Sequence, residues 1–164
     1  MPFVLSAKSL SYTTHVDPRL IAIAKLAIQL SEQDFGITEE QSRTPAEEAA
    51  KVAAGASETM HTHHLIDPAT GFSGAIDAVP YAGGKFVWDW ALIYPVAAAF
   101  KKASVQLATP ITWGGVWDRL MTEYPDDDAA AMQAAETAYV ARRRAAKQKK
   151  KVFVDGPHFE LGRN

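Results

Sequence analysis

Apolar positions recur at helical spacing in the first part of the chain. After the pair Asp17-Pro18, apolar side chains follow one another three or four residues apart, at Leu20, Ile23, Leu26, Ala27 and Leu30. This spacing places them on one face of an α-helix. Aspartate is a favoured N-cap and proline a favoured first helical residue, so the pattern predicts a helix over about residues 17–32.

Two further helices are predicted before the middle of the chain and just after it. Thr44 and Glu47 have capping-box spacing, and Gly55 is a natural stop, so a helix is expected to begin at Thr44 and to end at Gly55. A longer helix is expected over about residues 90–107, with Pro95 in its first turns, where a missing N–H is tolerated.

Short apolar runs bounded by turn residues predict strands. They are expected at residues 35–38, 75–79 and 111–113, and a turn at 81–84 leads into residues 85–88. Two strand-like pieces, 152–154 and 158–161, flank an Asp-Gly-Pro turn. Helices and strands do not alternate as in a doubly wound sheet. The predicted class is therefore α+β, with a small antiparallel sheet packed with helices.

Charge is concentrated in a helical segment near the C-terminus. Asp126, Asp127 and Asp128 precede an alanine-rich stretch that ends in basic residues at 142–144 and 147–151, which predicts a helical insertion over residues 119–150. The basic end could contact an anionic membrane surface. Acids at its start and bases at its end also match the helix macrodipole, and we favour that interpretation. No aromatic platform accompanies these bases, so nucleic-acid binding has less support.

Composition narrows the chemistry. The chain has 164 residues, which suits one domain over residues 1–164, and 48% of them are apolar. It contains no cysteine, which excludes thiol nucleophiles and cysteine-ligated zinc, so a metal must be held by histidines and carboxylates. The formal charge of −2 offers no general attraction to nucleic acid. We expect a monomer.

Histidines cluster with acids in two places. His61, His63 and His64 lie in a predicted loop, and Asp77 follows on a strand, whereas Asp155 comes three residues before His158. Catalytic zinc takes three N or O ligands and leaves a position open for water. The two places supply such ligands and a spare acid. In the simpler interpretation, the segment from Asp155 is only a turn between strands.

Tryptophans near this chemistry could line a cleft. Trp88, Trp90 and Trp113 are candidates, although a position in the core is the favoured interpretation.

Several motifs together resemble the family of peptidoglycan L-alanyl-D-glutamate endopeptidases and related D-alanyl-D-alanine carboxypeptidases. The order of the motifs is most similar to the phage endolysin branch, and the resemblance runs from about residue 17 to residue 161. The motifs are Gly55-Ala56-Ser57-Glu58-Thr59-Met60, His64-Leu65, Ala75-Ile76-Asp77-Ala78-Val79-Pro80-Tyr81, Gly84, Trp88-Asp89-Trp90, Trp113-Gly114-Gly115 and Asp155-Gly156-Pro157-His158-Phe159-Glu160-Leu161.

This resemblance implies roles for individual residues. It implies that Zn²⁺ is held by His64, Asp77 and His158, and that Asp155 is the catalytic carboxylate. Arg43, followed by Thr44, matches an arginine that contacts the substrate, and Thr62 is the nearest hydroxyl to the serine that precedes the family's first histidine. The loop between His64 and Asp77 is longer than is usual in the family, so His61 or His63 could replace His64 as the first ligand.

The implied function is that of a zinc-dependent endolysin that cleaves peptidoglycan stem peptides between L-alanine and D-glutamate. The alternatives are a carboxypeptidase that removes D-alanine and a wall-binding module without catalysis. Retention of all four candidate positions argues against the wall-binding module. The first ten residues lack the pattern of a secretory signal, and no apolar run is long enough to span a membrane. We therefore expect synthesis in the host cytoplasm and action on the cell wall after release.

Overall fold

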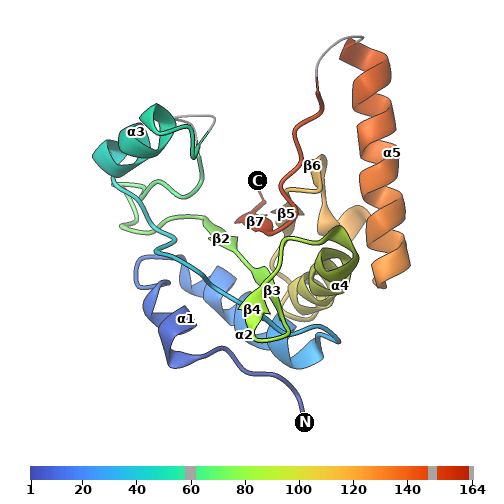
Figure 1. Cartoon of the computed structure of the whole chain (residues 1–164), viewed down its shortest axis with the longest axis horizontal. Coiled ribbons are helices and arrows are strands. Elements are labelled where there is room, and N and C mark those ends of the chain that lie inside the picture. Colours follow the sequence, from blue (N-terminus) through green and yellow to red (C-terminus); the bar gives the residue numbers. More distant parts are fainter. Residues whose placement is uncertain (58–61, 148–150, 163–164) are drawn as a thin grey trace.

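The computed structural model describes residues 1–57, 62–147 and 151–162 (Figure 1). Its helices are α1 (Ala7–Ser11), α2 (Pro18–Leu30), α3 (Pro45–Ala53), α4 (Trp90–Gln106) and α5 (Ala129–Lys147), with a 3-10 turn η1 (Met121–Glu123). Its strands are β1 (Phe35–Gly36), β2 (Ala75–Asp77), β3 (Val79–Ala82), β4 (Lys85–Phe86), β5 (Ile111–Trp113), β6 (Val116–Leu120) and β7 (His158–Leu161).

The strands form two small antiparallel sheets. One has the order β1-β3-β4 and the other the order β2-β7-β5-β6. The predicted α+β class is confirmed, but the predicted strand at 75–79 is two strands in different sheets. The chain changes sheets at Ala78, whose N–H donates to Pro157 O at 2.9 Å. Asp77 therefore lies at the point where the two sheets meet.

The helix predicted at 17–32 is α2, and it packs against α4 in the core. Asp17 caps it by accepting a hydrogen bond from Arg19 N at 2.9 Å, and Pro18 is its first residue. Leu20, Ile23 and Ala27 of the predicted apolar face are fully buried. The ring of Phe100 from α4 stacks on the ring of Phe159 from β7 in the larger sheet, with a centroid distance of 3.8 Å. This packing fixes β7 on the helical layer.

The helix α3 begins as its sequence predicts. Thr44 accepts a hydrogen bond from Glu47 N at 3.3 Å, and the Glu47 carboxylate accepts one from Thr44 N at 2.7 Å, so both halves of the capping box form. Two otherwise unpaired N–H groups at the start of the helix are thereby satisfied.

Trp113 belongs to the core, as the favoured interpretation held. Its side chain is buried, and its indole N–H donates to Gly156 O at 2.7 Å. Trp90 is half-buried against the same core. Trp88 is 64% exposed, so the core interpretation is wrong for this residue. A Cβ on Gly114 would overlap the backbone oxygen of Asp155, so glycine is required where β5 meets the Asp155 turn. Trp113 and Gly114 together hold that turn against the sheet.

Two predictions about the C-terminal third differ from the structure. Residues 116–120 form β6, which pairs with β5 through the Gly114-Gly115 turn, so the helix of the predicted 119–150 insertion begins only at Ala129. Residues 152–154 are not a strand. Val152 and Val154 pack against the core, and Phe153 stacks on Trp117 at 5.7 Å, so their apolar character reflects packing. The short helix α1 was not predicted.

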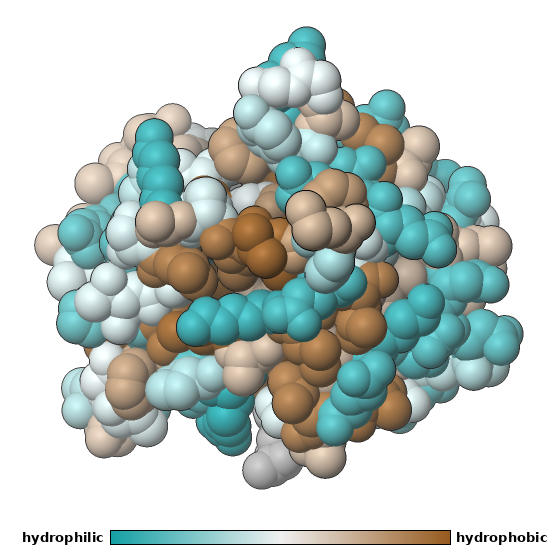
Figure 2. Space-filling view, turned by 90° about the horizontal axis from the view of Figure 1, so that it is seen from below, coloured by the Kyte–Doolittle hydropathy of each residue, from teal (hydrophilic) through white to brown (hydrophobic). Residues whose placement is uncertain are grey.

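The face below α2 and α4 in Figure 1 is partly apolar. Figure 2 shows hydrophobic residues gathered on this face and crossed by hydrophilic ones. Within the described ranges, no helix is both long and apolar enough to cross a bilayer.

Candidate metal centre

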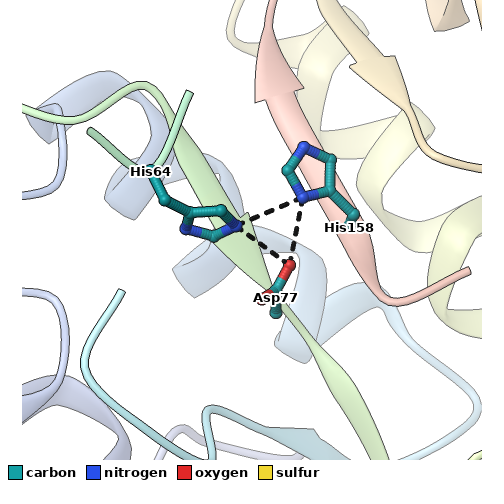
Figure 3. Close-up of side chains that lie close together, drawn as sticks. All are labelled: His64, Asp77 and His158. Atoms are coloured by element: carbon teal, nitrogen blue, oxygen red, sulfur yellow. Dashed lines mark hydrogen bonds and ion pairs between the residues drawn. The ribbon is translucent and has the colours of Figure 1, made fainter. Parts of the chain in front are cut away.

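Three side chains from distant parts of the sequence meet at the junction of the sheets (Figure 3). His64 comes from the loop before β2, Asp77 ends β2, and His158 begins β7 directly opposite Asp77 in the strand register. His64 Nε2 lies 3.2 Å from His158 Nδ1 and 3.3 Å from Asp77 Oδ1. His158 Nδ1 lies 3.1 Å from the same oxygen. Three potential ligand atoms thus converge on one point.

Each histidine has a second partner that fixes its tautomer. His64 Nδ1 lies 2.8 Å from the backbone oxygen of Gln41, and since a carbonyl oxygen only accepts, this nitrogen carries the proton. His158 Nε2 donates to the Glu160 carboxylate at 3.0 Å. The nitrogens that face Asp77 are positioned to act as ligands once His158 Nδ1 has lost its proton. Metal-binding histidines in proteins are commonly oriented in this way.

Gln41 links two of these side chains. Besides holding His64 through its backbone, it accepts a hydrogen bond from Asp77 N through Oε1 at 2.7 Å, and its side chain is fully buried. Gln41 was not predicted as a site residue, and no local motif marks it. Glu160 was not assigned a role either, although its position two residues after His158 places it on the same face of the strand.

The separations of the three ligand atoms fit one metal ion. Ligands about 2.0–2.1 Å from a tetrahedral zinc ion lie about 3.3–3.4 Å from one another. The three observed separations, 3.1, 3.2 and 3.3 Å, are close to that edge length. Two imidazoles and a carboxylate are also ligands that zinc accepts. His64, Asp77 and His158 could therefore hold a metal ion.

The electrostatics of the centre favour an ionised carboxylate. Burial by itself would raise the pKa of Asp77, but His64 and His158 hold that pKa well below its usual range. Burial opposes charge on His158, yet its hydrogen bonds to Asp77 and Glu160 raise its pKa to about 9. A metal ion would have to displace the proton from His158 Nδ1, so metal and proton compete for this nitrogen.

Asp155 lies beside the centre in the turn before β7. Its backbone N–H donates to Gly114 O at 2.9 Å, and its backbone oxygen accepts from His158 N at 3.2 Å. Burial and the negative charge of Asp77 raise the pKa of its carboxyl group. A carboxylate with a raised pKa is a better proton acceptor near neutral pH than an ordinary one.

The predicted substrate-binding residues lie on the same side of the molecule. Arg43 is buried, and its guanidinium contacts Glu48 Oε2 at 3.0 Å. The backbone of Arg43 also bridges to the histidine loop, with its N–H donating to His64 O at 2.8 Å. Thr62 Oγ1 accepts from His64 N at 3.2 Å. Both residues thus contact the loop that carries the first histidine.

The alternatives for the first ligand differ in position. His63 Nδ1 lies 3.5 Å from Glu160 Oε2, outside the group of three ligand atoms, and His61 lies outside the described residues. Among the histidines of this loop that the structure describes, His64 is the one that joins Asp77 and His158.

A groove of about 810 Å³ opens over the centre. Its floor contains His64, Asp77, Asp155, His158 and Glu160. Figure 1 shows α3 and α5 on either side of β2 and β7, and residues of both helices line the groove. Trp117, which was not among the predicted site residues, lines it too, with its ring 5.1 Å from that of His158. The centre is therefore accessible to a ligand that enters between the two helices.

Comparisons with known proteins agree on one family. A family model described as phage L-alanyl-D-glutamate peptidase matches residues 1–140, which include His64 and Asp77 and end before Asp155. The L-alanyl-D-glutamate peptidase of Escherichia phage T5 is 32% identical over 122 residues, which cover 72% of this chain and 84% of the relative.

A solved structure has the same fold. The L-Ala D-Glu endopeptidase ChiX of Serratia marcescens superposes with a TM-score of 0.64, covering 97% of this chain and 90% of that chain at 23% identity. Because the family model matches most of the length of this chain, the chain belongs to the phage L-alanyl-D-glutamate peptidase family.

Proposed function

We propose that this chain is a zinc peptidase that hydrolyses the bond between L-alanine and D-glutamate in peptidoglycan stem peptides. The proposal is supported by the family and by the activity named for the phage T5 relative. The observation that carries the zinc assignment is the convergence of His64, Asp77 and His158 at tetrahedral spacing on the floor of an open groove. The cell wall is the expected place of action.

Three residues would hold the metal ion, and their surroundings support that role. Gln41 and Glu160 orient the two imidazoles, and the low pKa of Asp77 keeps its carboxylate charged. When bound, a zinc ion supplies Lewis-acid chemistry, polarising the scissile carbonyl and acidifying an attacking water. The chain itself contributes a fixed geometry for that ion.

Asp155 is the proposed general base. It accepts a proton from the attacking water and passes that proton to the amine that leaves with D-glutamate. Its raised pKa and its place in the groove support this role. The turn that holds it is fixed by Trp113 and Gly114, so the carboxyl group stays near the metal ligands.

Arg43 and Thr62 are the proposed substrate contacts. Arg43 lines the groove and is held in place by Glu48, so its guanidinium is oriented before a ligand arrives. A guanidinium presents paired N–H donors that suit a carboxylate or carbonyl of the stem peptide. Thr62 lines the groove near His64 and offers a hydroxyl to the same ligand.

The first test is hydrolysis of purified peptidoglycan. We expect the wild type to release peptides, to lose activity when stripped with a chelator, and to regain it with zinc. Asp155→Asn should bind zinc yet release nothing, whereas the exposed Asp127→Asn should behave as wild type. New amino termini on D-glutamate identify the proposed bond, and free D-alanine would identify a carboxypeptidase instead. A zinc-loaded wild type that binds the wall and releases nothing would overturn the peptidase proposal.

A further inference from the structure

The two walls of the groove both carry cations. On the α3 side, Arg43 and Lys51 line it, and on the α5 side, Arg143 and Lys151 do so. The carboxylates of the floor, by contrast, belong to the metal centre and its partners. A ligand that enters between α3 and α5 therefore passes between two positively charged surfaces.

The cations of the α3 wall are already paired within the protein. Lys51 Nζ lies 2.9 Å from Glu39 Oε1, and Arg43 contacts Glu48 at 3.0 Å and Glu39 at 3.9 Å. Two carboxylates thus offset the two positive charges of this wall. Its attraction for an anion is correspondingly reduced.

The cations of the α5 wall are not offset in this way. Among the residues that the structure describes, neither Arg143 nor Lys151 has an ion-pair partner. The neighbouring Arg142 does have one, because Asp118 of β6 lies 3.1 Å from its Nη2, and Arg142 lines a different hollow between β6 and α5. Successive residues of a helix point in different directions. Arg143, one residue after Arg142, therefore faces the groove instead, and it is half-buried there.

Aromatic side chains surround these charges. Tyr139 lies one turn before Arg143 on α5 and lines the groove, as do Trp117 and Phe153, which stack at 5.7 Å. Low-polarity surroundings strengthen the interaction of a cation with an anionic ligand, because less of the field is screened by water. The α5 wall therefore combines positive charge without an ion-pair partner among the described residues with aromatic surface.

We propose that Arg143, assisted by Lys151, is a specificity-determining subsite for a carboxylate on the D-glutamate side of the scissile bond. This inference rests on the proposed function. D-Glutamate in a stem peptide continues through its side-chain carboxyl group, which leaves its α-carboxylate free, and diaminopimelate in the next position adds another. The L-alanine side is joined to sugar and offers no carboxylate. The α5 wall thus binds the leaving part of the substrate, opposite Arg43.

The test compares two synthetic stem peptides that differ only in charge, one with free carboxylates and one with the same groups amidated. Arg143→Gln should lower kcat/KM for the charged peptide about tenfold, mainly through KM, and hardly change it for the amidated one. Arg143→Gln combined with Lys151→Gln should lose more on the charged peptide. Arg143→Lys should recover part of the loss, because it restores the charge without the planar fork. Arg144→Gln, an exposed neighbour outside the groove, is the matched control.

Equal losses on both peptides, or a loss in Arg144→Gln as large as in Arg143→Gln, would overturn the subsite. If the proposed function itself is wrong, the result is different, because the wild type then cleaves neither peptide. In that case, calorimetric binding of the leaving fragment, a γ-D-glutamyl-diaminopimelate dipeptide, still tests the subsite. Weaker binding to Arg143→Gln than to Arg144→Gln supports it. Unchanged binding of the fragment, together with reduced binding of Arg143→Gln to anionic lipid vesicles, would assign the wall to a membrane instead.

Discussion

The floor of the groove and its α5 wall both carry charged side chains, histidines and carboxylates on the floor and an arginine and a lysine on the wall, but only those of the floor are held by partners within the described residues. On the floor, His158 contacts Asp77 on one side and Glu160 on the other, and His64 is held by Gln41. On the wall, Arg143 has no such partner among the described residues. A metal centre needs fixed ligand atoms, because its affinity depends on their spacing, whereas a subsite for a flexible peptide needs available charge.

The two regions are also built over different distances in the sequence. The floor joins residues 81 and 94 positions apart, so it exists only when β2 and β7 pair. The wall comes from one helix and the segment that follows it. We therefore expect substitutions on the floor to affect metal and activity strongly, and substitutions on the walls to affect substrate preference or stability.

The largest effect is expected from removing a ligand. His158→Ala should lower zinc affinity by more than about 100-fold, because outer partners alone account for about 10–100-fold. Hydrolysis should fall with it. Metal content after dialysis and peptide release measure the two effects, and the exposed His15→Ala is the control. Full zinc retention in His158→Ala would remove this residue from the centre.

A smaller effect is expected from the outer partner of the same histidine. Glu160→Ala should weaken zinc binding by about 10–100-fold, because His158 loses the acceptor that orients its ring and raises its basicity. Competition with a chelator of known affinity measures the change. Glu32→Ala removes an exposed carboxylate that is far from His158 in the sequence, and this control should leave zinc affinity unaltered.

The metal-free protein should show a distinct dependence of stability on pH. The pKa of His158 in the folded state is raised to about 9, above the ordinary value of about 6.5 in an unfolded chain. Its ion pairs therefore contribute fully below about pH 6.5 and are lost as pH rises through about 9. The melting temperature should fall across this interval, and a flat profile there would contradict the charge assigned to His158.

The smallest effect is expected at the base of the α3 wall. Thr44→Ala removes the side chain that caps α3 and should destabilise the protein by about 1 kcal/mol. For a chain of this size, that corresponds to a fall in melting temperature of about 2–4 °C. Zinc content should stay that of the wild type. A change in zinc content would mean that α3 is coupled to the floor more tightly than its contacts indicate.

Local signals in the sequence predicted several elements well. The cap and proline at Asp17-Pro18 and the capping box at Thr44 act within one turn of helix, so they could be read without knowledge of the fold. Residues 152–154 show the limit of this approach. Their apolar character was attributed to a strand, but it comes from packing against Trp117 and the core.

The sequence by itself determined the helices other than α1, the α+β class, the resemblance to a peptidase family and the candidate residues Asp77, Asp155 and His158. It left three neighbouring histidines as candidates for one position, because loop residues so close in sequence differ only in where the folded backbone points them. The tertiary structure decided that His64 faces Asp77, that Gln41 and Glu160 hold the two imidazoles, and that Arg143 faces the groove. These relations depend on strand pairing across many residues, and no local pattern encodes them.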